Sequence, residues 1–177
     1  RDLGRQVNAT SAGQNPFAAI LSCIDSRVPA ELVFDLGVGD IFSVRVAGNV
    51  IGTKSLGSLE YAICVAGVKL IVVLGHTRCG AVTSAVQLIS EGQSAHAATG
   101  CQHLQAIVDE IAPSVNEHLP DRLETLTKDE FEQEVDQVAA RNVLHTAKQI
   151  LSRSEVIRAG VEQGRVKVAG ALYDVKT

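Results

Sequence analysis

The chain has 177 residues, of which 46% are hydrophobic and 20% are charged, and its formal net charge is −4. Such a length and balance predict one globular domain, so we treat residues 1–177 as a single domain. The small negative charge and the absence of any run of Lys or Arg argue against nucleic acid or an anionic membrane surface as a partner. No stretch reaches the roughly 18 uninterrupted apolar residues of a membrane span and no signal-peptide pattern opens the chain, which argues against direct membrane insertion.

Four cysteines without signs of secretion favour a reducing compartment, the cytoplasm, and metal or catalytic use rather than disulfides. The chain begins at Arg1 and contains no Met. We therefore expect a fragment, a processed form or a domain of a longer protein.

Apolar runs and helical patterns alternate along the chain and predict an α/β fold. In chain order they are a strand at 17–22, a helix at 28–35, a strand at 41–47, a helix at 55–66, a strand at 70–74, a helix at 80–90, helices at 101–118 and 127–150, and a loosely alternating strand at 166–175. The small, polar segment 91–100 is typical of a mobile connection, and Thr127 and Glu130 have the spacing of a capping box. Strands separated by helices predict a mostly parallel central sheet flanked by helices.

Two short motifs directly follow predicted strands: CIDSR at 23–27 and HTRCG at 76–80. In a parallel sheet such strand ends meet at one edge, where open α/β sheets place their chemistry. Two thiolates and an imidazole suit Zn²⁺, and three protein ligands leave a fourth position open, as in catalytic zinc sites. The sequence therefore predicts one Zn²⁺ per chain, bound by Cys23, His76 and Cys79.

Asp25 and Arg27 flank this predicted site. A zinc with two thiolates is a weaker Lewis acid than one with three histidines, so its water needs further help. Arg27 can hold the Asp25 carboxylate in a bidentate pair and keep it off the metal, so that Asp25 is a fourth ligand only in a closed state. The alternative is an ordinary surface salt bridge in a turn. Gly80, at the expected start of a helix, leaves room for a small substrate and offers backbone N–H groups to an anion.

The remaining metal-type residues have plainer interpretations. Cys64 lies in the apolar stripe of a predicted helix, and we expect it in the core. Cys101 and His103 form a Cys-x-His pair, for which a solvated pair is a simpler interpretation than a second zinc site. The other histidines are expected on the surface: His96, His118 and His145.

The segments CIDSR, GDIFSVRVAGN (39–49), SLEYA (58–62) and VVLGHTRCGAV (72–82) resemble those of the β-class carbonic anhydrases, in the same order and at similar spacing. The resemblance is specific from about residue 14 to 82 and weaker through 175. It implies a zinc enzyme in which zinc-bound hydroxide hydrates CO₂ reversibly to bicarbonate and a proton. It also implies a four-stranded parallel core with an added edge strand, and homodimers that pair into tetramers.

Carried onto matching positions, the resemblance implies the same three zinc ligands and the Asp25–Arg27 dyad. The family's substrate-pocket residues fall on Gln14, Phe42 and Tyr61. The Gln14 amide would donate to a bicarbonate oxygen, and the two aromatic rings would supply a narrow apolar wall suited to CO₂. In the family, such pockets form across the dimer interface.

Some features depart from the family pattern. Only about a dozen residues precede the first strand, so we expect that the family's N-terminal helices are truncated here. Val46 in RVAGN stands where Asn is commoner. In one subgroup a Trp, an Arg and a Tyr bind inhibitory bicarbonate; Arg45 matches the Arg, but Ile20 replaces the Trp. Some family members are joined to membrane anion transporters, and such a fusion would place this domain at the cytoplasmic face of a membrane.

Two other functions remain open at this point. The same scaffold supports hydrolysis of carbon disulfide, which the residues do not exclude. A non-catalytic bicarbonate-sensing or assembly domain would predict loss of a ligand or of the dyad, whereas all five positions are present.

Overall fold

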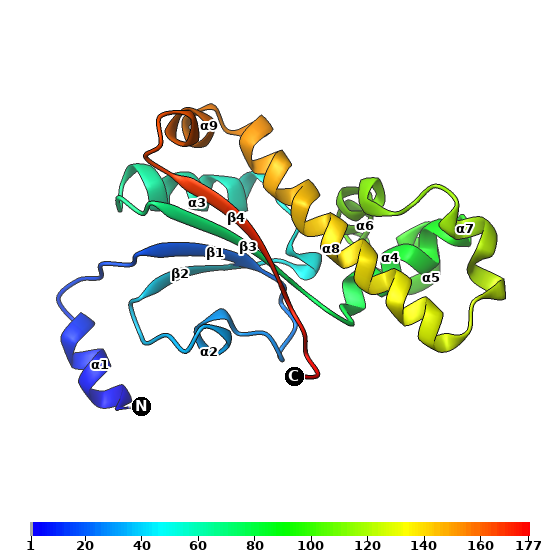
Figure 1. The fold of residues 1–177 in the computed structure, drawn as a ribbon, viewed down its shortest axis with the longest axis horizontal. Helices are drawn as coiled ribbons and strands as arrows, with labels where there is room; N and C mark the ends of the chain where they lie inside the picture. Colours follow the sequence, from blue (N-terminus) through cyan, green and yellow to red (C-terminus); the bar gives the residue numbers. More distant parts are fainter. Residues whose placement is uncertain (1) are drawn as a thin grey trace.

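The computed structural model describes residues 2–177, in which a parallel four-stranded sheet is flanked by helices (Figure 1). The strands are β1 (Ala18–Ser22), β2 (Ile41–Arg45), β3 (Leu70–His76) and β4 (Lys167–Tyr173), in the order β2-β1-β3-β4. All three strand pairings are parallel, which confirms the predicted α/β fold and its four-stranded core. The added edge strand that the family resemblance implied is not found among residues 2–177.

Helices fill the connections between the strands. The α-helices are α1 (Leu3–Thr10), α2 (Ala30–Val33), α3 (Thr53–Cys64), α4 (Gly80–Ser90), α5 (Ala95–Thr99), α6 (Gln105–Ile111), α7 (Leu119–Arg122), α8 (Lys128–Arg153) and α9 (Glu155–Glu162). Short 3₁₀ turns are η1 (Ala47–Asn49), η2 (Ala112–Ser114) and η3 (Leu123–Thr125). None of the described helices is long and apolar enough to cross a membrane.

The polar segment 91–100 differs from the sequence prediction, because it contains a helix. Ser94 caps α5 by accepting a hydrogen bond from the Ala97 amide, and Gly100 ends the helix with φ +74°. Ala95 is fully buried, so this segment is anchored to the molecule. The expectation of a mobile connection was wrong because a single buried Ala and a good cap are a weak signal in a polar sequence.

The sheet is covered on both faces, and its two central strands are therefore mostly apolar until their carboxyl ends, where Ser22 and His76 are buried polar residues. Every residue of β1 is buried. One face packs against α3, α8 and α9 through a cluster that includes Leu21, Leu59 and Ile150. The other face packs against α2 through a smaller cluster that includes Ile20 and Ala30.

The strand order creates a switch point between β1 and β3. From β1 the chain passes to β2 on one side, and it then returns to place β3 on the other side of β1. Ser22 at the end of β1 pairs with Leu74 near the end of β3, so the two strands end side by side. A crevice at the carboxyl ends of such strands is where open α/β sheets bind ligands.

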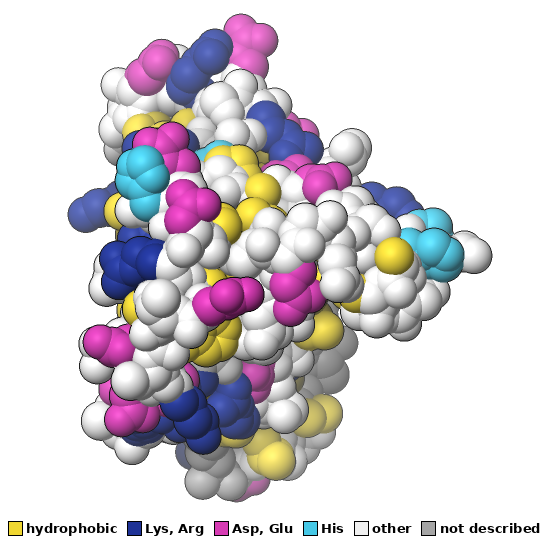
Figure 2. All heavy atoms as spheres, turned by 90° about the vertical axis from the view of Figure 1, so that its right-hand side faces the viewer, with side chains coloured by type: hydrophobic (Ala, Val, Ile, Leu, Met, Phe, Trp, Pro, Cys, Tyr) yellow, Lys and Arg dark blue, Asp and Glu magenta, His cyan; other side chains and the backbone are white. Residues whose placement is uncertain are grey.

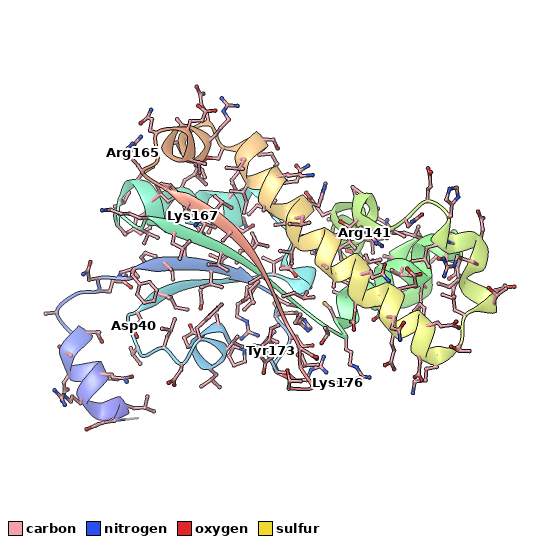
Figure 3. All side chains as sticks on the ribbon, in the orientation of Figure 1. Asp40, Arg141, Arg165, Lys167, Tyr173 and Lys176 are labelled. Atoms are coloured by element: carbon pink, nitrogen blue, oxygen red, sulfur yellow. The ribbon has the colours of Figure 1, made fainter. Side chains whose placement is uncertain are left out.

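Helix α8 is the longest helix and crosses over β3 and β4 (Figure 1). It begins with the predicted capping box, in which Thr127 and Glu130 bond reciprocally. Gly75 and Gly170 leave the sheet surface bare under Val143, since a Cβ at either position would collide with that side chain. Two residues before Val143 in α8, Arg141 points toward the α6 side, and its Nε donates to the Ser114 carbonyl at 2.8 Å (Figure 3).

The helices α4–α7 gather at one end of the molecule, beyond the carboxyl ends of the strands (Figure 1). Seen from that end, basic and acidic side chains are interspersed (Figure 2). This face therefore has no extended field of positive charge of the kind that nucleic acids require.

Candidate metal centre

Three buried side chains converge at the switch point. Cys23 follows β1 directly, His76 is the last residue of β3, and Cys79 is the N-cap residue of α4. Their ligand atoms all lie within 4.8 Å of one another, and the two sulfur atoms are 3.8 Å apart. Two sulfurs bound at about 2.3 Å to a tetrahedral zinc would be about 3.8 Å apart, so the spacing fits this metal.

The histidine also fits a metal ion. Its Nδ1 lies 2.9 Å from the Thr77 carbonyl, which makes Nδ1 the protonated nitrogen and leaves a lone pair on Nε2. Nε2 is buried and has no hydrogen-bond partner. A buried polar atom without a partner is costly, and a metal ion between Nε2 and the two sulfurs satisfies it.

The two sulfur atoms are within hydrogen-bond distance of each other, and either thiol can be the donor. This hydrogen bond lowers the pKa of Cys23 to about 4, against the opposing effect of burial. The pKa of Cys79 is raised, because the hydrogen bond with Cys23 and the burial of the thiol both disfavour its charged form. For His76, burial lowers the pKa, but its contacts with Cys23 and with the Thr77 carbonyl outweigh burial, and the net shift is upward. Metal binding must therefore displace protons from this cluster.

Asp25 and Arg27 form the predicted bidentate pair beside this cluster. Arg27 Nε donates to Oδ1 at 3.0 Å, and Nη2 donates to Oδ2 at 2.7 Å. These bonds to Arg27 hold the pKa of Asp25 well below its usual range, at about 2. The same Oδ2 lies 3.9 Å from His76 Nε2, so an ionised carboxylate faces the metal cluster without belonging to it.

Two further groups hold the loop after β1, and sequence reasoning missed both roles. Arg45 donates through Nε to the Cys23 carbonyl at 2.9 Å and through Nη2 to the Asp25 carbonyl at 2.6 Å. The sequence linked Arg45 to a regulatory bicarbonate site, whereas here its guanidinium fixes the ligand loop. Gly48 donates its N–H to Cys23 Sγ at 3.3 Å, and its carbonyl accepts from Asn142 Nδ2 at 2.7 Å.

The predicted substrate residues lie apart from the metal cluster within one chain. Phe42 and Tyr61 contact each other edge to face, with ring centroids 6.3 Å apart. They line a cavity of about 510 Å³ with Ser43, Val44, Lys54, Gly57 and Ser58, none of which is a predicted ligand. Gln14 is exposed, in the segment between α1 and β1. Gly80, the first residue of α4, is exposed with open space where a Cβ would lie.

The remaining cysteines are both exposed. The prediction that Cys64 lies in the core was wrong: it ends α3 on the side away from Leu59 and Ala62, which fill the buried face. Cys101 and His103 are exposed, and they belong to no group of three or more potential metal ligands among residues 2–177.

Comparisons with known proteins agree with this geometry. A family described as carbonic anhydrase matches residues 18–177. Carbonic anhydrase 2 of Mycobacterium tuberculosis is 42% identical over 166 residues, which cover 93% of this chain and 73% of that protein. The carbonic anhydrase of Mycolicibacterium smegmatis is 39% identical over 169 residues, covering 96% and 75%.

Solved structures show the same architecture. The β-carbonic anhydrase CafA of Aspergillus fumigatus matches with a TM-score of 0.80 at 26% identity, covering 98% of this chain and 78% of that one. The β-carbonic anhydrase CcaA matches with a TM-score of 0.74 at 27% identity, covering 99% and 75%.

A parallel sheet with a buried Cys/His/Cys cluster at its switch point defines an α/β enzyme whose site can hold a metal ion. The comparisons narrow this class, and the chain belongs to the β-class carbonic anhydrase family.

Proposed function

We propose that the protein hydrates CO₂ reversibly to bicarbonate and a proton, with one Zn²⁺ per chain held by Cys23, His76 and Cys79. One observation carries the proposal: two sulfurs 3.8 Å apart and an unpartnered Nε2 converge beside an ionised carboxylate. Zinc held there would supply a Lewis acid that lowers the pKa of water, although less strongly than a three-histidine zinc, because the two thiolates offset its charge.

Asp25 has the role of a hydrogen-bond acceptor. With a pKa of about 2 its carboxylate is ionised at neutral pH, so it can accept a hydrogen bond but cannot keep a proton. Its oxygen Oδ2 faces the cluster and can orient the attacking water. The proton released by hydration must therefore leave to buffer or solvent, while Arg27 holds the carboxylate in place.

Substrate reaches the centre beside Gly80. Apart from its chain neighbours and the backbone of its own helix, nothing lies within 4 Å of the place where a Cβ would be, which leaves room for a molecule as small as CO₂. The backbone N–H groups at the start of α4 favour the negative charge that develops on the product.

The working unit is at least a dimer. Tyr61 is 54% exposed, and its wall with Phe42 lines a cavity that contains none of the ligands. In a symmetric pair, this wall and Gln14 of one protomer close the site of its partner.

All four cysteines are free thiols, which suits a reducing compartment such as the cytoplasm.

Stopped-flow measurement of CO₂ hydration, combined with zinc analysis, tests the proposal. The zinc-loaded protein should accelerate hydration well above the buffer rate. Removal of the metal by a chelator should abolish this rate, and added Zn²⁺ should restore it. A protein with one zinc per chain and no rate above buffer would refute the function.

A further inference from the structure

Two carboxylates of α8 are tied to the dyad through a single residue, Arg78. The Arg78 amide donates to Asp136 Oδ1 at 2.6 Å, and its guanidinium donates to Glu132 Oε2 at 2.6 Å. Glu132 and Asp136 are one helical turn apart, so they face the same loop. The Arg78 carbonyl in turn accepts from Arg27 Nη2 at 3.1 Å, and this same nitrogen holds Asp25 Oδ2.

The backbone of Arg78 needs such support. Its φ is +55°, which lies in the left-handed region that residues other than Gly rarely adopt. The ion pair with Glu132 is partly exposed and weak by itself, whereas the bond from a main-chain N–H to the Asp136 carboxylate is charge-assisted. Asp136 is therefore the stronger support for this conformation.

Arg27 also has room to move away. Its side chain is 50% exposed, and it lines a cavity of about 380 Å³ together with residues of α8 that include Lys128 and Phe131. Its other bonds run to Asp25, two residues away in the same loop. The Arg78 carbonyl thus ties the dyad to the segment 77–79 between β3 and α4, which directly follows His76 and ends at Cys79.

We infer that Asp136, assisted by Glu132, is a positioning residue that holds Arg78 in its left-handed conformation and thereby aligns the Asp25–Arg27 dyad with the metal centre. This inference rests on the proposed function for its kinetic consequence. Asp136 affects the position of the Asp25–Arg27 dyad and does not disturb the three proposed metal ligands.

Substitution of Asp136 tests the inference. Asp136→Ala should keep one zinc per chain and lose CO₂ hydration by about tenfold, the usual size of an outer-shell effect. Asp136→Asn should recover most of that loss, because its amide oxygen can accept the same N–H. Glu134→Ala is the matched control: Glu134 lies on α8 and pairs with Arg122 at 3.1 Å, away from the dyad. It should leave the rate unchanged.

A spectroscopic readout separates positioning from general damage. The absorption spectrum of the Co²⁺-substituted protein reports the metal's ligand set. In Arg27→Ala, Asp25 is free to approach the metal, and the spectrum should change. The spectrum of Asp136→Ala should move in the same direction, and that of Glu134→Ala should match the parent. If Asp136→Ala fails to fold, Glu132→Ala should show a smaller change of the same kind.

Several results would overturn the inference: an Asp136→Ala rate within twofold of the parent, a Co²⁺ spectrum identical to that of the parent, or a loss of rate that Asp136→Asn does not recover. A parent protein without CO₂ hydration would instead refute the proposed function. In that case the Co²⁺ spectra of the variants would still decide whether Asp136 positions the dyad.

Discussion

Cys79 combines two roles, because it is a predicted metal ligand and also the N-cap residue of α4. Replacing Cys79 by Ala leaves two protein ligands, too few for a stable tetrahedral zinc site. We expect metal content and CO₂ hydration to fall together, to near zero. Elemental analysis of the purified variant beside a hydration assay measures both.

The same substitution at Cys101 is the control, because this cysteine is exposed and outside the cluster. Cys101→Ala should retain full zinc and activity. Full zinc occupancy in Cys79→Ala would remove Cys79 from the ligand set.

At the residue scale, the sequence predicted the cluster but not what holds it. The convergence of Cys23, His76 and Cys79 was predictable because two short motifs follow two buried strands, and strand ends meet in a parallel sheet. Asn142 was not predictable, since it reaches Gly48 across 94 residues and a lone Asn inside a helix gives no signal. Arg78 and Asp136 are 58 residues apart, and a left-handed Arg leaves no mark in the sequence.

The start of α8 offers a test of stability against pH. Thr127 donates to Glu130 through both its amide and its hydroxyl, and these bonds lower the pKa of Glu130 below 4.5. A lowered pKa in the folded state stabilises the protein above the unfolded value of 4.5, and this stability is lost as pH falls through the folded value. Glu130→Gln should therefore lower the melting temperature near neutral pH, and the difference from the parent should become smaller at an acidic pH well below 4.5.

Melting curves at both pH values measure this difference, with Glu124→Gln as a control for the loss of an exposed charge near the same helix. An equal deficit of the Glu130→Gln variant at both pH values would contradict the capping role of the ionised carboxylate.

The contact between α8 and the sheet depends on Gly75. A methyl group there would collide with Val143, so Gly75→Ala should cost about 1–3 kcal/mol of unfolding free energy through overpacking. Val143→Ala makes room for the methyl group, so the double variant should be less destabilised than the sum of the two single variants.

Urea denaturation of the three proteins measures this coupling. Gly13→Ala is the control, since nothing lies within 4 Å of its Cβ position. Strictly additive losses in the double variant would show that Gly75 and Val143 do not limit this packing.

At the element scale, the predicted bounds of a helix were most accurate where local residues mark both of its ends. Helix α4 has the predicted bounds because Cys79 and Gly80 precede an apolar helical pattern that ends near Gly92. The α5 segment was missed because its anchor is a single buried Ala. The prediction that Cys64 is buried was wrong because the last residues of α3 turn away from the core. The apolar pattern of the sequence does not reveal this turn.

For the whole molecule, the exposed wall of Tyr61 and Phe42 predicts self-association. Tyr61→Arg places a charge in the proposed interface, so it should sediment as a monomer, keep its zinc and lose most of its CO₂ hydration. Sedimentation velocity with a parallel rate measurement tests this. Val156→Arg on α9, also at an exposed apolar residue, should leave both unchanged. A parent protein that is a fully active monomer would refute the dimer.

The order of the ligands along the chain has a consequence for how the protein is made. Cys23 and Cys79 are 56 residues apart, so a metal that joins them encloses α2, β2, η1, α3 and β3 in one loop. By the chain-entropy relation for crosslinks, closing a loop of this length lowers the conformational entropy of the unfolded chain, and this raises its free energy by about 4 kcal/mol. A nascent chain that has emerged as far as Cys79 already carries all three proposed ligands, whereas Asp136 and Asn142 lie further along the chain and emerge later. Binding of the metal and alignment of the dyad would thus be separable in time, with α8 completing a centre whose proposed ligands are already present in the chain.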